Sequence, residues 1–283
     1  MSTIIRLTFL EMKEKKILHI TIILTAIFLA LYGVAAKYAY VGLANQEAVV
    51  KLGFLSQFIS MGIYVGGFII AFLSVFSSVG AISSDIENGT YDAILSKPIA
   101  RYEIVLGKFI GLLSILIPYV TIIYLGIIGI NMFFGKGEVI NFALGAIIRS
   151  LLIIYILPIL LVSIGIFLSC RTSTVGAGVI LVILYFLGMI GGFLERISFV
   201  LTDQVAKSVI SNIGIITSLI IPSDIVYRKA SSILFTTKSG LNFNIESMLG
   251  GNVQPSSFMM IYITIYIIAM IILAIRKFQK RDL

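Results

Sequence analysis

The chain has 283 residues, of which 59% are hydrophobic and 12% are charged, and its mean hydropathy is +1.10. Soluble globular domains have about 45–50% apolar and about 25% charged residues, so this composition excludes them and indicates a membrane protein with several spans. The net charge of +8 does not require a nucleic-acid partner, because Lys and Arg beside membrane spans suit the anionic lipids of the cytoplasmic leaflet.

The first 16 residues are predicted to form a helix that lies on the membrane surface. Ile5, Phe9 and Met12 fall at i, i+4 and i+7 and would form its buried face, and Glu11 stands four residues before Lys15. A frayed cytoplasmic tail is the alternative. A cleaved signal peptide fits less well, because the apolar run at 17–36 exceeds the 7–15 residues of its core.

Six segments are long and apolar enough to cross a bilayer, which takes about 20 residues. They are 17–36, 58–82, 109–134, 149–169, 175–194 and 258–275. The sequence therefore predicts an all-α integral membrane protein that forms one transmembrane domain over 1–283. Arg149 is expected at the end of the fourth span, with its charge at the membrane surface. The shorter run at 209–221 is predicted to be interfacial or re-entrant.

A charged, turn-rich segment at 85–101 joins the second and third spans. Asn88-Gly89 favours a turn, Thr90 is a good N-cap and Pro98 disfavours helix at the residue before it, which predicts a two-turn helix over 90–96. Within this helix Tyr91, Ile94 and Leu95 fall at i, i+3 and i+4. We infer that this small apolar face docks against another protein.

Small residues are concentrated in the second and fifth spans, where they favour close approach between helices. The alternative interpretation is that these spans line a substrate path. The candidates for either role are Gly62, Gly66, Ser74, Ser77, Gly188 and Gly191.

Residues 195–257 form the one long segment outside the predicted spans. It mixes charged residues with apolar patches and has a break at Pro222-Ser223-Asp224. We expect it to be extracellular. It would gate an exit, bind a partner or cap the helix bundle, and the pattern favours none of these.

The positions of Lys and Arg predict the orientation, since positive residues in short loops mark the cytoplasmic side. Four basic groups fall on one side, and both termini are therefore predicted to be cytoplasmic in the cell membrane. These groups are Arg6, Lys13, Lys15 and Lys16; Lys97, Arg101 and Lys108; Arg171; and Arg276, Lys277, Lys280 and Arg281.

The segment at 85–101 resembles the signature of a known family, the membrane subunit of ABC transporters of the ABC-2 type. The resemblance rests on an ordered set of residues: Glu87, Gly89, Thr90, Leu95, Ser96, Pro98, Arg101, Gly107 and Lys108. Asp85 stands where glutamate is more usual.

The resemblance implies a coupling helix that sits in a groove of an ATPase subunit and transmits its motion to the membrane. Glu87, Gly89, Thr90, Tyr91, Ile94, Leu95, Pro98 and Arg101 would then be the ATPase-coupling residues. It further implies an ATP-driven exporter, with two ATPase subunits and a second permease copy, most simply a homodimer.

No catalytic or cofactor site is evident in the sequence. The chain lacks the phosphate-binding motif G-x-x-x-x-G-K-[ST], so ATP and Mg²⁺ are expected on a partner chain. One cysteine, Cys170, and one histidine, His19, do not suggest a metal site. The alternatives are an ion-coupled secondary transporter, which needs ionisable groups inside the spans that the predicted boundaries do not include, and a non-transporting sensor or scaffold.

Overall fold

The structure is a computed structural model that describes all residues except 91–99, 136–142, 199, 200, 202, 236–254 and 281–283. Every regular element in the described part is a helix. The helices are α1 (Ser2–Glu14), α2 (Lys16–Gly42), α3 (Ala48–Val79), α4 (Ser83–Glu87), α6 (Arg101–Gly135), α7 (Leu144–Ile154), α8 (Ile156–Arg171), α9 (Thr174–Ser198), α10 (Gln204–Ile220), α11 (Ser223–Phe235) and α13 (Ser257–Gln279).

Six candidate membrane spans are present among the described residues, and each predicted span lies inside one of them. They are Lys16–Gly42, Ala48–Glu87, Arg101–Gly135, Leu144–Arg171, Thr174–Ser198 and Phe258–Gln279. The all-α integral membrane fold is thus confirmed, although the helices are longer than predicted. Several extensions take in charged residues, and two of these residues are buried, Lys108 in α6 and Glu195 in α9.

The fourth span begins earlier than predicted and is interrupted in the middle. The α7 helix starts at Leu144, so Arg149 lies inside the helix and not at its end, on the exposed side away from the buried Ile147 and Ser150. α7 ends at Ile154 and α8 begins two residues later. Pro158 explains the break, because its ring interferes with the carbonyl of the residue four positions earlier.

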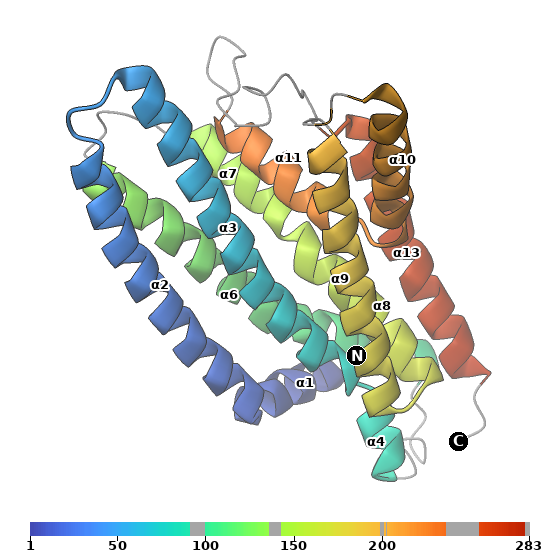
Figure 1. Cartoon of the computed structure of the whole chain (residues 1–283). Helices are drawn as coiled ribbons and strands as arrows, with labels where there is room; N and C mark the ends of the chain where they lie inside the picture. Colours follow the sequence, from blue (N-terminus) through green and yellow to red (C-terminus); the bar gives the residue numbers. More distant parts are fainter. Residues whose placement is uncertain (91–99, 136–142, 199–200, 202, 236–254, 281–283) are drawn as a thin grey trace.

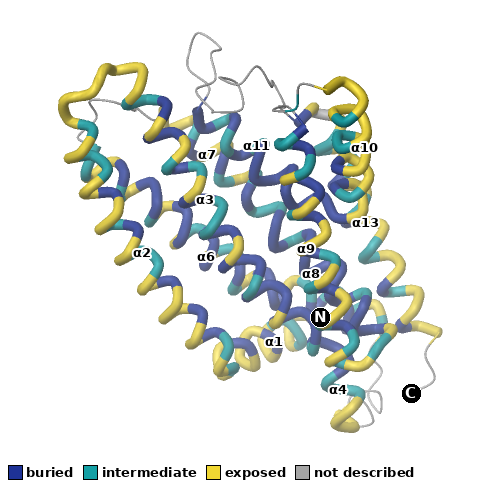
Figure 2. Tube along the Cα trace, in the orientation of Figure 1, coloured by how far each residue is buried: buried dark blue, intermediate teal, exposed yellow. Residues whose placement is uncertain are grey.

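Helices α3 and α8 form the centre of the bundle. α3 packs against α2, α6, α8, α9 and α11, and α8 contacts α6, α9 and α13 as well. The outer helices α2, α9 and α13 expose rows of large apolar side chains, such as Leu31, Ile183 and Ile265 (Figure 2). Such wide apolar exposure around a packed core suits a lipid environment.

The first helix packs against α6, and Met12 is the one buried residue of the three predicted for its membrane-facing side. Thr8 and Met12 are buried and Ile4 packs against the core, whereas Phe9 is exposed. α1, α4, the turn between α8 and α9, and the last turn of α13 all lie at the lower end of the molecule in Figure 1. The described members of the four basic groups belong to or adjoin these elements, or lie in the first turns of α2 and α6.

The segment after α9 folds back into the bundle. α10 runs alongside α9, and α11 then turns by 101° at Ile221 and Pro222 and packs among α3, α7 and α9 (Figure 1). Together they form a bent pair that matches a broken span or a re-entrant loop. Glu195 and α11 are therefore buried within the bundle and not freely exposed, the bent pair matches the re-entrant interpretation of 209–221, and the extracellular assignment of 195–257 stays a prediction.

Candidate functional site

The segment at 85–101 is described at its two flanks, 85–90 and 100–101. Tyr91, Ile94, Leu95 and Pro98, and with them nearly all of the predicted helix 90–96, lie outside the described residues. Asp85 and Glu87 belong to the short helix α4, which ends in a turn at Gly89. Gly89 has φ 68°, a left-handed conformation that glycine adopts without steric cost after the end of a helix.

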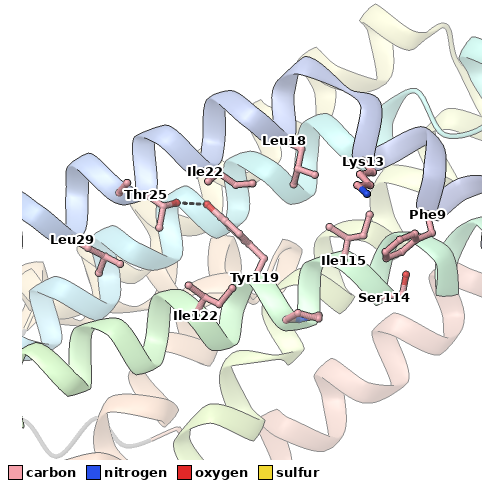
Figure 3. A pocket seen from close by; sticks show the side chains of 12 residues that line it. Phe9, Lys13, Leu18, Ile22, Thr25, Leu29, Ser114, Ile115, Tyr119 and Ile122 are labelled. Atoms are coloured by element: carbon pink, nitrogen blue, oxygen red, sulfur yellow. Dashed lines mark hydrogen bonds between the residues drawn. The ribbon is translucent and has the colours of Figure 1, made fainter.

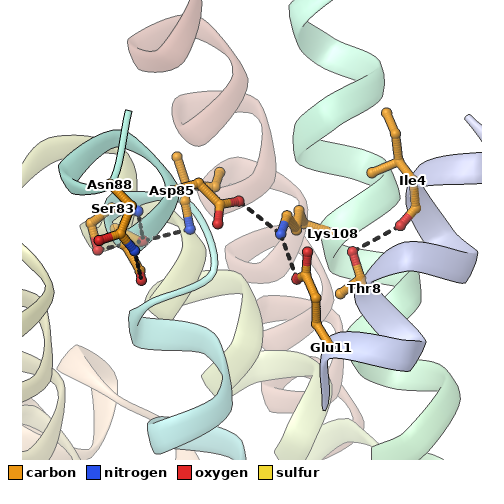
Figure 4. A network of polar contacts seen from close by, with 10 residues as sticks. Ile4, Thr8, Glu11, Ser83, Asp85, Asn88 and Lys108 are labelled. Carbon is orange, nitrogen blue, oxygen red and sulfur yellow. Dashed lines mark hydrogen bonds and ion pairs between the residues drawn. The ribbon is translucent and has the colours of Figure 1, made fainter. Parts of the chain in front are cut away.

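A buried lysine ties the first flank to two other helices. Lys108 of α6 places its Nζ atom 2.8 Å from Asp85 Oδ2 of α4 and 2.8 Å from Glu11 Oε2 of α1 (Figure 4). Its side chain is only 7% exposed. A buried ammonium is stable only when it is paired, so Lys108 holds α1 and α4 together on α6.

Two glycines allow α1 to approach α6 closely enough for this contact. A Cβ atom on Gly107 would lie 2.7 Å from Ile4, and one on Gly111 would lie 2.6 Å from Thr8. Both distances are too short for carbon atoms. The Gly107-Lys108 pair of the sequence signature thus has a structural reason in this chain: the glycine admits α1 and the lysine pairs with it.

Glu87 caps the start of α9. Its Oε1 atom accepts a hydrogen bond from the backbone N–H of Thr174 at 2.9 Å, and its Oε2 atom accepts one from Thr174 Oγ1 at 3.0 Å. A carboxylate at this position satisfies a free N–H group and interacts favourably with the positive end of the helix dipole. A movement of α4 therefore acts directly on the first turn of α9.

The start of α4 is fixed to the end of α8 in a similar way. Ser169 Oγ accepts hydrogen bonds from the backbone N–H groups of Ile82 at 3.0 Å and Ser83 at 2.8 Å. Ser83 Oγ also lies 2.8 Å from Thr174 Oγ1. These three serine and threonine side chains join α4 to the α8–α9 turn.

The second flank is attached to the last helix. Arg101 donates hydrogen bonds from Nη1 to the carbonyl oxygens of Gln279 at 3.0 Å and Phe278 at 3.4 Å. These are carbonyls at the C-terminal end of α13, where a positive charge is favourable. The two flanks of the segment are thus bonded to α6, α9 and α13, and α1 joins the same network through Lys108.

A second cluster of charges, which the sequence analysis missed, is buried where α11 meets α9. Arg228 Nη2 lies 2.6 Å from Glu195 Oε2, Arg228 Nε lies 3.0 Å from Asp224 Oδ2, and Arg196 Nη2 lies 2.7 Å from Asp224 Oδ1. The cluster has two carboxylates and two guanidinium groups and no net charge. Two features of the sequence could have indicated this cluster. Asp224 and Arg228 are four residues apart, as in a helical ion pair, and Glu195 and Arg196 are adjacent.

The bend between α10 and α11 is also held by hydrogen bonds from α13. Tyr262 and Tyr266 donate to the carbonyls of Leu219 at 2.7 Å and Ile220 at 3.0 Å. Ser150 of α7 donates to the carbonyl of Ala230 at 2.9 Å. The bent pair of α10 and α11, which we call the hairpin, is therefore fixed within the bundle by contacts from several helices.

The candidate small residues contact neighbouring helices of the same chain. A Cβ atom on Gly62 would lie 2.5 Å from Tyr32 of α2, and one on Gly66 would lie 2.9 Å from Ile123 of α6. Gly188 and Gly191 face the hairpin at Ile221 and Thr217. Ser74 and Ser77 are fully buried in α3. In this chain these positions serve close helix packing, and a role in a substrate path stays a prediction.

Comparison with known proteins identifies the family. None of the curated proteins compared with the chain matches it. The model of one protein family, described as ABC-2 family transporter protein, matches residues 7–283. This match covers nearly the whole chain and includes α1 from residue 7 onward, the segment at 85–101, α10, α11 and α13. The chain therefore belongs to the ABC-2 transporter family and is a membrane component of a transporter.

Proposed function

We propose that this chain is the permease subunit of an ATP-driven exporter. Two copies, most simply a homodimer, form the translocation path, and two separate ATPase subunits bind ATP and Mg²⁺. The residues at 85–101 form the coupling element, and the end of the molecule that carries α1, α4 and the end of α13 faces the cytoplasm of the cell.

The attachment of both flanks of 85–101 is the observation that carries this proposal. Asp85 bonds to Lys108 of α6, which also holds Glu11 of α1, Glu87 bonds to α9, and Arg101 bonds to α13. A connection that served only to join α3 to α6 would not need bonds to α9 and α13 as well. An element that receives force from a partner needs them, because otherwise its movement would not reach the spans.

The docking surface is the apolar face of Tyr91, Ile94 and Leu95 that the sequence predicts. An unpaired carboxylate buried in a protein groove costs several kcal/mol, which is enough to break a transient complex. Leu95→Asp should therefore abolish capture of the ATPase and ATP-driven transport in proteoliposomes. The spans are unchanged, so the variant should still insert and purify.

Ala93→Asp is the matched control, because Ala93 lies on the opposite face of the predicted helix, is not part of the sequence signature and receives the same charge. We expect it to keep ATPase binding and transport. A Leu95→Asp permease that binds its ATPase and transports at the normal rate would exclude 90–96 as the docking element.

The orientation is tested with single cysteines in a Cys170→Ser background. Cysteines at Asn45 and Lys136 should react with an impermeant thiol reagent in whole cells, and cysteines at Lys97 and Lys280 should react only after the membrane is opened. Labelling of the Lys97 position in intact cells would place 85–101 outside and refute the coupling role.

Secondary transport is the competing function, and the buried carboxylates of Glu195 and Asp224 give it a physical basis that the sequence did not reveal. Each carboxylate, however, is paired with an arginine of the same chain, so the pair would have to separate before the carboxylate could bind a coupling ion. In proteoliposomes the permease alone should show no uptake driven by an ion gradient. Transport with the ATPase and ATP should persist when a protonophore is added.

A further inference from the structure

A groove of about 560 Å³ lies between α1, α2 and α6, away from the coupling segment and from the hairpin. Its wall includes Phe9 and Lys13 of α1, Ile22 and Thr25 of α2, and Ile115 and Tyr119 of α6 (Figure 3). The volume is within the range of about 300–1,000 Å³ that is usual for sites that hold small molecules.

The hydroxyl groups in the wall are already bonded within the protein. Thr25 Oγ1 lies 2.5 Å from Tyr119 Oη and donates to the carbonyl of Thr21 at 2.8 Å. Ser114 Oγ donates to the carbonyl of Gly111 at 2.6 Å. The remaining wall is aliphatic or aromatic, so the groove favours an apolar occupant.

Lys13 places a positive charge at one end of this apolar wall. It is exposed and has no hydrogen-bond or ion-pair partner among the described residues. Glu11, two residues earlier, is directed to Lys108 instead. A cation beside an apolar groove complements a molecule with an anionic head and a hydrocarbon tail.

The groove opens where a membrane lipid has access to it. Ile22 and Ile122 in its wall are 49% and 63% exposed, and they belong to candidate membrane spans. Lys13 belongs to α1, which ends two residues before the first span begins. Lipid headgroups lie at this level of a membrane, and acyl chains lie beside α2 and α6.

We propose that the groove binds one phospholipid, with an acyl chain between α2 and α6 and an anionic headgroup at Lys13. The headgroup is recognised by charge and the chain by apolar contact. This site would select anionic over zwitterionic lipids, in contrast to apolar surface with no Lys or Arg beside it, which has no charge with which to distinguish them.

The test uses vesicles that contain equal amounts of phosphatidylglycerol and phosphatidylcholine, with a photoreactive diazirine in the acyl chain of one lipid at a time. After illumination, labelled residues of the purified permease are mapped by mass spectrometry. We expect Ile22, Ile115 and Ile122 to be labelled about fivefold more by phosphatidylglycerol, the factor that about 1 kcal/mol per lysine gives at 25 °C.

Two variants and one control separate the contributions. Lys13→Ala should reduce the preference to about one, and Ala26→Phe, which places a ring in the groove wall, should remove labelling by both lipids. Lys16→Ala is the matched control. It removes the same charge three residues after Lys13, and Lys16 does not line the groove. This variant should keep most of the preference.

Three outcomes would overturn the proposal. The first is equal labelling of the wild-type groove by the two lipids, and the second is a preference that survives Lys13→Ala. The third is cross-linking of the groove residues to a second copy of the chain, which would show that a protein interface covers this face.

Discussion

Removing Arg228 should destabilise the permease more than any exposed arginine does. Its side chain is 4% exposed and contacts Glu195 and Asp224. Arg228→Met leaves the buried cluster with two carboxylates and one guanidinium group, and loss of one partner from a buried ion pair costs about 3–5 kcal/mol. Since about 1 kcal/mol shifts Tm by roughly 2–4 °C for chains somewhat shorter than this one, we expect Tm to fall by roughly 6–20 °C.

A second substitution should rescue much of this loss. In Arg228→Met with Glu195→Gln, the remaining charges are Asp224 and Arg196, which are 2.7 Å apart and cancel. Replacing both partners of a buried ion pair by uncharged side chains often changes the free energy of unfolding very little. The double variant should therefore be more stable than Arg228→Met alone, a coupling that a double-mutant cycle measures.

The assay is thermal unfolding of the detergent-purified permease, followed by the loss of its monodisperse peak in size-exclusion chromatography. Arg149→Met is the control, because Arg149 is exposed on α7, and such surface changes are usually within about 0.5 kcal/mol. The reasoning is refuted if Arg228→Met unfolds at the same temperature as Arg149→Met, or if Glu195→Gln lowers Tm further in the Arg228→Met background.

Three further predictions concern the segment at 85–101 and the packing of α3. Glu87→Ala should weaken the start of α9 by about 0.5–2 kcal/mol and reduce ATP-driven transport while capture of the ATPase persists, and Glu87→Asp should restore part of the transport. Gly89→Val should strain the turn by about 1–2 kcal/mol, and because this short turn can relax in the free permease but must re-form on docking, the strain should lower ATPase affinity by roughly 5–30-fold in a binding titration and leave Tm nearly unchanged. Gly67→Ala should lower Tm, because its methyl group would overlap the ring of Tyr227, whereas Gly129→Ala, with open space around it, should leave Tm unchanged or raise it.

Hydropathy alone predicted the existence and order of the six spans, but it misplaced their ends. The predicted third span began at residue 109 and the fifth ended at 194, each one residue short of a charged side chain. In the structure α6 includes Lys108 and α9 includes Glu195, and both side chains are buried. A hydropathy window penalises a charge whether or not it is paired, and the partners Asp85 and Arg228 are distant in the sequence.

The hairpin of α10 and α11 was the largest difference, and its cause is similar. α11 carries Asp224, Arg228 and Lys229 in 13 residues, a composition that indicates an exposed helix. The structure buries it because Asp224 and Arg228 are paired and Gly192 of α9 leaves room for the Asp224 side chain. A single sequence shows the charges but not which of them meet in space.

The candidate coupling residues were predicted from a motif, and the structure supplies physical roles that the motif did not contain. The sequence marked Glu87 and Arg101 without indicating their partners. The structure bonds Glu87 to the start of α9 and Arg101 to the end of α13. The partners are 87 and 177 positions apart in the chain. Periodicity and turn patterns describe only neighbouring residues, so they could not predict these contacts.

Helix α9 connects the two polar clusters, which makes it the element through which we expect coupling to pass. Its first residue, Thr174, is held by Glu87, and Glu195 in its last turn is held by Arg228 of α11. Between these ends Gly188 and Gly191 admit the hairpin so closely that α9 and the hairpin must move together. A displacement of α4 by an ATPase would therefore shift α9 along its length and carry the hairpin at the far end of the bundle. By this argument Glu87 and Arg228, at opposite ends of one helix, act on the same movement, and loss of either contact should uncouple ATP hydrolysis from transport.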